Sequence, residues 1–212
     1  MMETLRKYIR ELLTESINPK IMSMIDRLQA DDLKIVIKRN DNGTSVAEIV
    51  GAEKQGTTVG WRGGVRNGRR IRVYASLTWI KTDENFDGPC LQSYQVGGSR
   101  AYAGYGPLLY DIAIELTGGL TADRTSVSDS AEAVWDYYSR NRPDVEVVQL
   151  DIPDDYFEDQ LTPDDPSDDC SQVPAYDRYG SGWHKSGLSK LIKKSGTPVI
   201  DELRNRGILE EL

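Results

Sequence analysis

Apolar residues recur at helical spacing through the first thirty positions. In residues 3–14 they follow an i, i+3, i+4, i+7, i+8 pattern, at Leu5, Tyr8, Ile9, Leu12 and Leu13. Asn18 and Pro19 then offer an N-cap and a proline for the first helical position, and a second apolar stripe follows at Ile21, Met24, Ile25 and Leu28. The pattern predicts two N-terminal amphipathic helices.

The pattern changes to strands from Asp32 onward. The segments "LKIVIKR" and "TSVAEIVGA" are separated by the turn signal "NDNG", which predicts a hairpin. A second hairpin is expected from "TTVGW" and "RIRVYASLTWI", which flank the basic Gly/Arg-rich tip at 60–70. The short segment "CLQSYQV" adds another strand, so we expect a run of mostly antiparallel strands.

Helical spacing returns at Pro107 and ends at Gly118. After it come a short strand in "LTADR", a helix in "SAEAVWDYYSR" with a capping box expected at Asp129 and Glu132, and a strand in "DVEVVQLD". Two short helices are expected near 186–194 and 198–206. The fold class that follows is α+β, a mostly antiparallel mixed sheet flanked by helices, with an N-terminal helical pair and a C-terminal helical extension.

Charge divides the chain further. Between Asp151 and Cys170 there are nine acidic residues and no basic one, which is typical of a solvated loop and is also compatible with a basic protein partner. We therefore expect an N-terminal helical segment at 1–30, an α/β core at 31–151, an acidic loop or insert at 152–182, and C-terminal helices at 183–212.

Composition narrows the function classes. The net charge of −8 argues against nonspecific nucleic-acid binding. No apolar run is long enough to span a membrane, and the N-terminus lacks a secretory signal, so a cytoplasmic location is expected. Cys90 and Cys170 allow at most one disulfide and have no metal-ligand spacing, and the lone His184 adds no ligand set, so no metal site is expected.

Glycines are concentrated in "GGSRAYAGYGPLLYDIAIE", immediately before the helix at Pro107. A Gly-rich turn that enters a helix presents unpaired backbone N–H groups, and the helix dipole favours an anion there. A phosphate site is one interpretation, and a tight turn alone is the other. The third glycine of a dinucleotide fingerprint and the Gly-Lys-Ser/Thr of a phosphate-binding loop are both missing.

The order of elements over 91–151 resembles the second half of the GNAT N-acetyltransferase family. In that family an Arg/Gln-x-x-Gly-x-Gly/Ala turn holds the pyrophosphate of acetyl-coenzyme A. Gly104, Tyr105 and Gly106 match this turn, whereas the arginine position falls on Ala101 and Arg100 lies one residue early. The resemblance implies a GNAT-like sheet and a cosubstrate site formed by that turn, Arg100, and the backbone of Tyr94 and Val96.

A second family signature, Asn-x-x-Ala-x-x-x-Tyr, reads here as Ser130-x-x-Ala133-x-x-x-Tyr137. The resemblance gives Tyr137 the role of proton donor to the departing thiolate, and an amphipathic edge residue is the alternative. A general base is not singled out by spacing. Glu48 and Asp111 are candidates, whereas Glu115 reads more simply as a solvated helix residue.

Two functions follow as expectations. The first is transfer of an acetyl group from acetyl-CoA to a primary amine acceptor by direct attack. The second is a catalytically degenerate GNAT-like binding or structural protein, such as a phage virion component. The second is favoured by the replaced asparagine, by the displaced arginine, and by the lack of the two helices that the family places between its first two strands. In addition, "LRKYIRELL" and "GYGPLLYDIA" are similar to segments of bacteriophage-encoded proteins. For a phage protein the expected location is the host cytoplasm.

Overall fold

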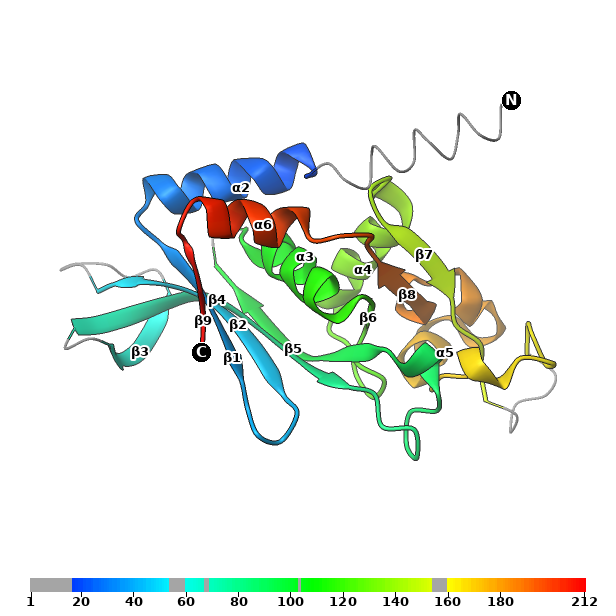
Figure 1. Ribbon diagram of the computed structural model, residues 1–212. Helices are drawn as coiled ribbons and strands as arrows, with labels where there is room; N and C mark the ends of the chain where they lie inside the picture. The colour runs from blue at the N-terminus through cyan, green and yellow to red at the C-terminus, as the bar shows by residue number, and fades with distance from the viewer. Residues whose placement is uncertain (1–16, 54–59, 67–68, 103, 154–159) are drawn as a thin grey trace, which may run out of the picture.

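The computed structural model describes residues 17–53, 60–66, 69–102, 104–153 and 160–212 (Figure 1). The helix expected over 3–14 lies outside the described residues. Within them, nine strands form one curled mixed sheet in the order β7-β8-β6-β5-β4-β2-β1-β9, with β3 paired to β4. The expected α+β class is therefore confirmed.

The strands are β1 (Lys34–Arg39), β2 (Ser45–Ala52), β3 (Trp61–Arg66), β4 (Arg69–Lys81), β5 (Tyr94–Ala101), β6 (Leu120–Thr121), β7 (Glu146–Gln149), β8 (Lys190–Lys193) and β9 (Leu209–Glu211). The α-helices are α2 (Pro19–Ala30), α3 (Gly106–Thr117), α4 (Asp129–Asn141), α5 (Val173–Tyr179) and α6 (Pro198–Asn205). Most strand pairs are antiparallel, as expected, and the parallel pairs are β1 with β9 and β5 with β6.

The main core lies between the sheet and the helices that cover it. Helix α3 packs beside α2 and α6 over the sheet (Figure 1). The predicted stripe of α2 is confirmed, because Ile21, Met24, Ile25 and Leu28 are all buried. Asn18 caps that helix by accepting a hydrogen bond from the Lys20 N–H at 3.0 Å.

Buried charges fix α3 against the C-terminal segment. Glu115, expected as a solvated residue, is 6% exposed. Its carboxylate accepts hydrogen bonds from Lys194 Nζ at 2.8 Å and from the backbone N–H groups of Val199 and Ile200 at 3.2 and 3.0 Å. Glu115 therefore serves as the cap of α6, a long-range contact that helical spacing does not reveal.

Several local predictions were wrong. The helix expected near 186–194 is a 3-10 turn followed by strand β8, which lies between β6 and β7 with Leu191 and Ile192 both buried. The segment expected as a hairpin tip at 60–70 is largely strand β3 and the start of β4. The cap of α4 is Ser128, one residue before the expected Asp129, and its hydroxyl accepts the Ala131 N–H.

The start of the strand expected at Cys90 is instead a left-handed turn closed by a disulfide to Cys170. Cys90, Leu91 and Gln92 have φ values of 45°, 52° and 54°, a conformation that non-glycine residues rarely adopt in succession. The disulfide joins this turn to the end of the acidic segment. Among the described helices, none has the length and apolar character needed to cross a membrane.

Candidate active site

A cleft opens where β5 and β6 separate. The two strands are paired only at Tyr94 with Leu120 and at Gln95 with Thr121, whereas β5 continues to Ala101. The register of β5 against β4 also shifts, so that Gly97 is an extra residue between Val96 and Gly98. A bulge of this kind redirects the backbone. The edge of β5 beyond Gln95 therefore has no partner in β6, and its backbone groups are available to a ligand.

Two adjoining cavities of about 200 and 180 Å³ occupy this cleft. Both are lined by Ser99, Tyr110 and Ala131, which come from β5, α3 and α4. We call the cavity of about 200 Å³ the cleft-mouth cavity; it also includes Arg100, Ala101 and Gly106. We call the cavity of about 180 Å³ the cleft-floor cavity; it includes Val96 to Gly98 and Asp123. Together the cavities follow β5 from its bulge to its end.

The N-terminus of α3 faces the cleft-mouth cavity and has no side-chain cap. Tyr105 occupies the cap position without a capping hydrogen bond, and Pro107 lies in the first turn. Gly104 adopts φ +75°, and a Cβ placed there would meet no atom within 4 Å. A Cβ on Gly106 would come no closer than 3.6 Å to another atom. The unpaired amides, the open space and the helix dipole together suit an anion.

The structure brings some of the predicted cosubstrate-binding residues to the cavities. Val96, Arg100 and Gly106 line them. Tyr94 packs its side chain against the core, and Tyr105 is buried, with Arg27 Cζ 4.0 Å from its ring centroid. The N–H groups of both tyrosines also donate within the protein, from Tyr94 to the Gly119 carbonyl at 3.3 Å and from Tyr105 to the Tyr102 carbonyl at 3.4 Å. Neither tyrosine therefore offers a side chain or a free N–H group to a ligand in the cleft.

Tyr137 is not among the residues that line either cavity. Lys20 Nζ lies 5.0 Å from the centroid of its ring, which also meets Tyr138 edge-on with the centroids 6.0 Å apart. The wall that α4 contributes to the cleft-mouth cavity consists of Ser130, Ala131 and Val134. The structure thus brings the serine of the predicted motif to the cleft but not its tyrosine.

Tyr110 is a phenol at the cleft that sequence reasoning did not select. Its side chain lies at the junction of the two cavities, and its hydroxyl donates a hydrogen bond to Ser99 Oγ at 3.3 Å. Burial raises the pKa of the Tyr110 hydroxyl, and the bond to Ser99 only partly opposes this. The phenol therefore stays protonated at neutral pH. Tyr110 lies in a nearly continuous apolar stretch of α3, so no spacing distinguished it from core residues.

Asp123 is a carboxylate in the lining of the cleft-floor cavity. Its Oδ1 accepts hydrogen bonds from the backbone N–H groups of Thr125 and Ser126 at 2.8 and 3.0 Å, and from the Thr125 hydroxyl at 2.6 Å. These bonds fix the orientation of the carboxylate. Asp123 lies two residues after β6 ends at Thr121, within "LTADR", and no spacing in the sequence distinguished it.

The carboxylates that the sequence offered as candidate general bases lie outside the two cavities. Glu48 pairs with Lys38 Nζ at 2.6 Å, and Asp111 and Glu115 belong to a buried ion cluster with Lys194. None of the three lines the two cavities. Asp123 is therefore the better-placed candidate to accept a proton there.

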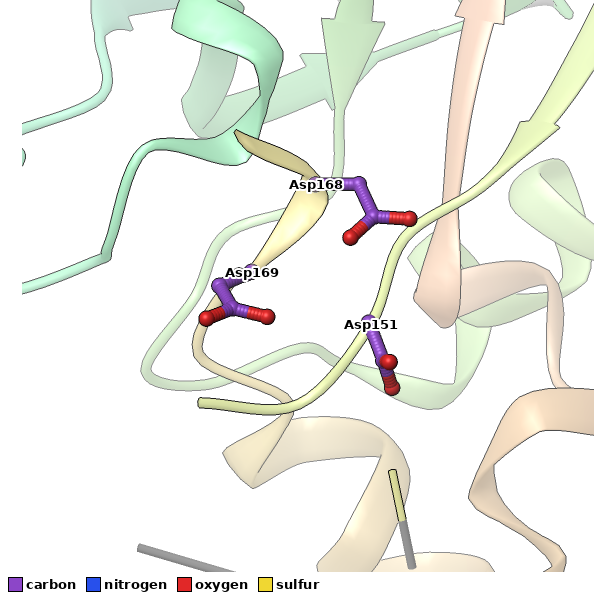
Figure 2. Close-up of side chains that lie close together, drawn as sticks. All are labelled: Asp151, Asp168 and Asp169. Carbon is purple, nitrogen blue, oxygen red and sulfur yellow. The ribbon is translucent and has the colours of Figure 1, made fainter. Parts of the chain in front are cut away.

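A separate group of carboxylates comes from the two ends of the acidic segment, Asp151 from its start and Asp168 and Asp169 from its end, with oxygen atoms within 4.8 Å of one another (Figure 2). Asp151 is already occupied by the protein itself, because it accepts backbone N–H groups from Ile152, Leu161 and Thr162. These bonds outweigh burial and lower the pKa of Asp151. The arrangement accounts for a loop anchor and does not by itself indicate a metal site.

Comparison with known proteins adds no assignment to this geometry: no family model, no curated protein and no solved structure matches the chain.

Proposed function

We propose that the protein is a GNAT-like acyltransferase that moves an acetyl group from acetyl-CoA to a primary amine. The observation that carries this proposal is the uncapped N-terminus of α3, which opens onto a cleft between two parallel strands that separate after two paired positions. The amides suit a diphosphate, and the cleft beside them suits an extended arm. This combination is more specific than a Gly-x-Gly turn alone.

The parts of the site match the parts of the cosubstrate in order along β5. The turn at Gly104 and Gly106 would hold the diphosphate, because glycine there leaves room at the backbone. The unpaired edge of β5 would hydrogen-bond the amides of the pantetheine arm. The bulge at Gly97 would place backbone N–H groups near the thioester carbonyl oxygen, where charge develops during acyl transfer.

Two side chains fit the proton transfers. The reaction forms a bond from the amine nitrogen to the acetyl carbon and breaks the carbon–sulfur bond, so the ammonium must lose a proton and the thiolate must gain one. Asp123, held in the cleft-floor cavity, would accept the proton of the amine, directly or through water. Tyr110, protonated and at the junction of the cavities, would supply the proton to sulfur.

The test is binding followed by turnover. Acetyl-CoA at 100 times its dissociation constant should stabilise the folded protein by about 2.7 kcal/mol, which a thermal-shift titration detects. Release of free thiol from acetyl-CoA in the presence of a panel of primary amines then reports transfer. No thermal shift at millimolar acetyl-CoA would overturn the proposal.

A second candidate is a GNAT-like domain that binds without catalysis, as a structural or accessory component of a phage particle. It is favoured by the position of Tyr137 outside both cavities and by the engagement of Arg100 with Tyr102 and Trp61. Binding of acetyl-CoA with no thiol release for any amine would support this candidate.

In either case we propose a cytoplasmic location, which for a phage protein is the host cytoplasm. We also propose a basic protein as the partner of the acidic segment.

A further inference from the structure

Three planar side chains gather at the end of the cleft, just beyond the cleft-mouth cavity. Arg100 lines that cavity, and its Cζ lies 4.9 Å from the ring centroid of Trp61 and 5.6 Å from that of Tyr102. The two rings are tilted, with centroids 5.8 Å apart, and Arg100 Nη2 donates a hydrogen bond to the Tyr102 hydroxyl at 3.0 Å. We call Trp61, Arg100 and Tyr102 the aromatic clamp.

The clamp is assembled from two separate strands. Trp61 begins β3 and is paired with Val73 of β4, whereas Tyr102 follows β5 and donates its backbone N–H to the Tyr74 carbonyl at 2.9 Å. Both rings are partly exposed, and Arg100 is exposed. By contrast, the other tryptophans, Trp79, Trp135 and Trp183, are buried. The clamp therefore presents aromatic and guanidinium surface beside a cavity and outside the core.

The aromatic clamp lies where a ligand bound along β5 would end. The cleft-floor cavity begins at Val96, both cavities meet at Ser99, the cleft-mouth cavity reaches Ala101, and Tyr102 follows directly. A ligand with its arm along the strand edge and its diphosphate at the α3 amides would extend its remaining part toward the clamp. In coenzyme A that remaining part is an adenine nucleotide.

We propose that the aromatic clamp binds the adenine nucleotide end of coenzyme A, with the base stacked on Trp61, Tyr102 and the Arg100 guanidinium. This inference rests on the proposed function. Purine rings stack on aromatic and guanidinium planes, and the cation of Arg100 also favours the nearby phosphates. The clamp extends the site onto β3, in the segment that the sequence predicted as a basic hairpin tip.

The test compares Trp61→Ala with the unmodified protein by isothermal titration with acetyl-CoA and with S-acetylpantetheine, which lacks the nucleotide. Loss of base stacking should weaken acetyl-CoA about tenfold or more and leave S-acetylpantetheine unchanged. Phe86→Ala removes an exposed aromatic side chain (84% exposed) that lines neither cavity and should change neither affinity. Equal acetyl-CoA affinity in Trp61→Ala and the unmodified protein would overturn the inference while leaving the acyltransferase proposal intact.

A fluorescence titration with adenosine bisphosphate, the nucleotide half of coenzyme A, separates the two proposals. Stacking on Trp61 should quench tryptophan emission in the unmodified protein and not in Trp61→Phe, because the remaining tryptophans are buried. If the nucleotide quenches the emission but acetyl-CoA binds no more tightly than the nucleotide alone, the clamp is supported and the acyltransferase proposal is contradicted. Absence of quenching would overturn the clamp.

Discussion

Lys194 Nζ lies 2.8 Å from Asp111 Oδ1, and both side chains are fully excluded from solvent. The same ammonium contacts Glu115 Oε1 at 2.8 Å, so one cation from the segment after β8 serves two carboxylates of α3. Arg142 Nη2 contacts the same Asp111 oxygen at 2.8 Å. Helix α3, whose N-terminus faces the cleft, is therefore held in place by ion pairs that are buried away from solvent.

Removal of the Lys194 charge should be severe. Lys194→Met leaves Asp111 and Glu115 with a buried excess of negative charge, and losing one partner of a buried pair typically costs about 3–5 kcal/mol. We expect a fall of that order in the free energy of unfolding, measured by urea denaturation. Lys185→Met, at an exposed position, is the matched control and should stay within about 0.5 kcal/mol of the unmodified protein. Comparable stability of the two variants would show that the cluster contributes little.

Gly106→Asp tests the anion site without damaging the fold. Gly106 is the first residue of α3, where an acidic side chain is favourable to the helix, and a Cβ there makes only an ordinary contact. The new carboxylate would compete for the amides and repel a diphosphate. We expect unchanged or higher thermal stability together with loss of acetyl-CoA binding in calorimetry, whereas Gly106→Ala should retain both. Binding by the aspartate variant at the original affinity would place the diphosphate elsewhere.

The two tyrosines give opposite predictions. Tyr110→Phe removes the hydroxyl at the junction of the cavities and should lower kcat about 100-fold, the usual contribution of a general acid, with the acetyl-CoA affinity unchanged. Tyr137→Phe should leave kcat unaltered, because its ring faces Lys20. Steady-state kinetics, with the amine that supports turnover of the unmodified protein, distinguishes them. A large loss of kcat only in Tyr137→Phe would restore the role that the sequence motif suggested.

Sequence patterns correctly predicted several elements that residues close together in the chain determine. The stripe of α2, the turn after β1 and the glycine that ends α3 all follow from local spacing, and Gly118 indeed adopts φ +71°. The helix expected near Leu191 failed for a different reason. Leu188, Leu191 and Ile192 have helical spacing, yet β8 lies inside the sheet and both of its central residues are buried. Burial on both faces of a strand erases the alternation that identifies strands.

The candidate site was only partly predictable for a similar reason. The glycine turn carries a local signal, so Gly104 and Gly106 were found. Tyr110 and Asp123 belong to the site only because β5 and β6 separate between α3 and α4, which is a tertiary property. The pairing of Cys90 with Cys170, which are 80 positions apart, was likewise open to the sequence only as a possibility.

The disulfide should contribute measurably to stability, because it closes a long loop in the unfolded chain. It also holds three consecutive residues with positive φ next to β5. Cys90→Ser combined with Cys170→Ser should lower the free energy of unfolding by about 2–4 kcal/mol, measured without reductant. Addition of reductant should shift the unmodified protein toward the double variant and leave the variant itself unchanged. In a reducing cytoplasm the two cysteines would be largely reduced, and the disulfide would not contribute its full stabilisation. If the unmodified protein is equally stable with and without reductant, the result favours two free thiols as the functional state.

Acid should release the acidic segment through Asp151. The backbone N–H groups of Leu161, Thr162 and Ile152, together with the Thr162 hydroxyl, overcome burial and hold the pKa of this carboxyl below its ordinary value of 3.8. A depressed pKa in the folded state means that the unfolded chain binds the proton more readily, so this stabilisation is present above the ordinary value and is lost as the pH falls through the folded one. We expect the free energy of unfolding of the unmodified protein to decline more steeply below pH 3.8 than that of Asp151→Asn. Asp164→Asn removes the same charge from an exposed position of the segment and should keep the steep decline. Parallel acid limbs for the unmodified protein and Asp151→Asn, in urea titrations at successive pH values, would show that another carboxylate anchors the loop.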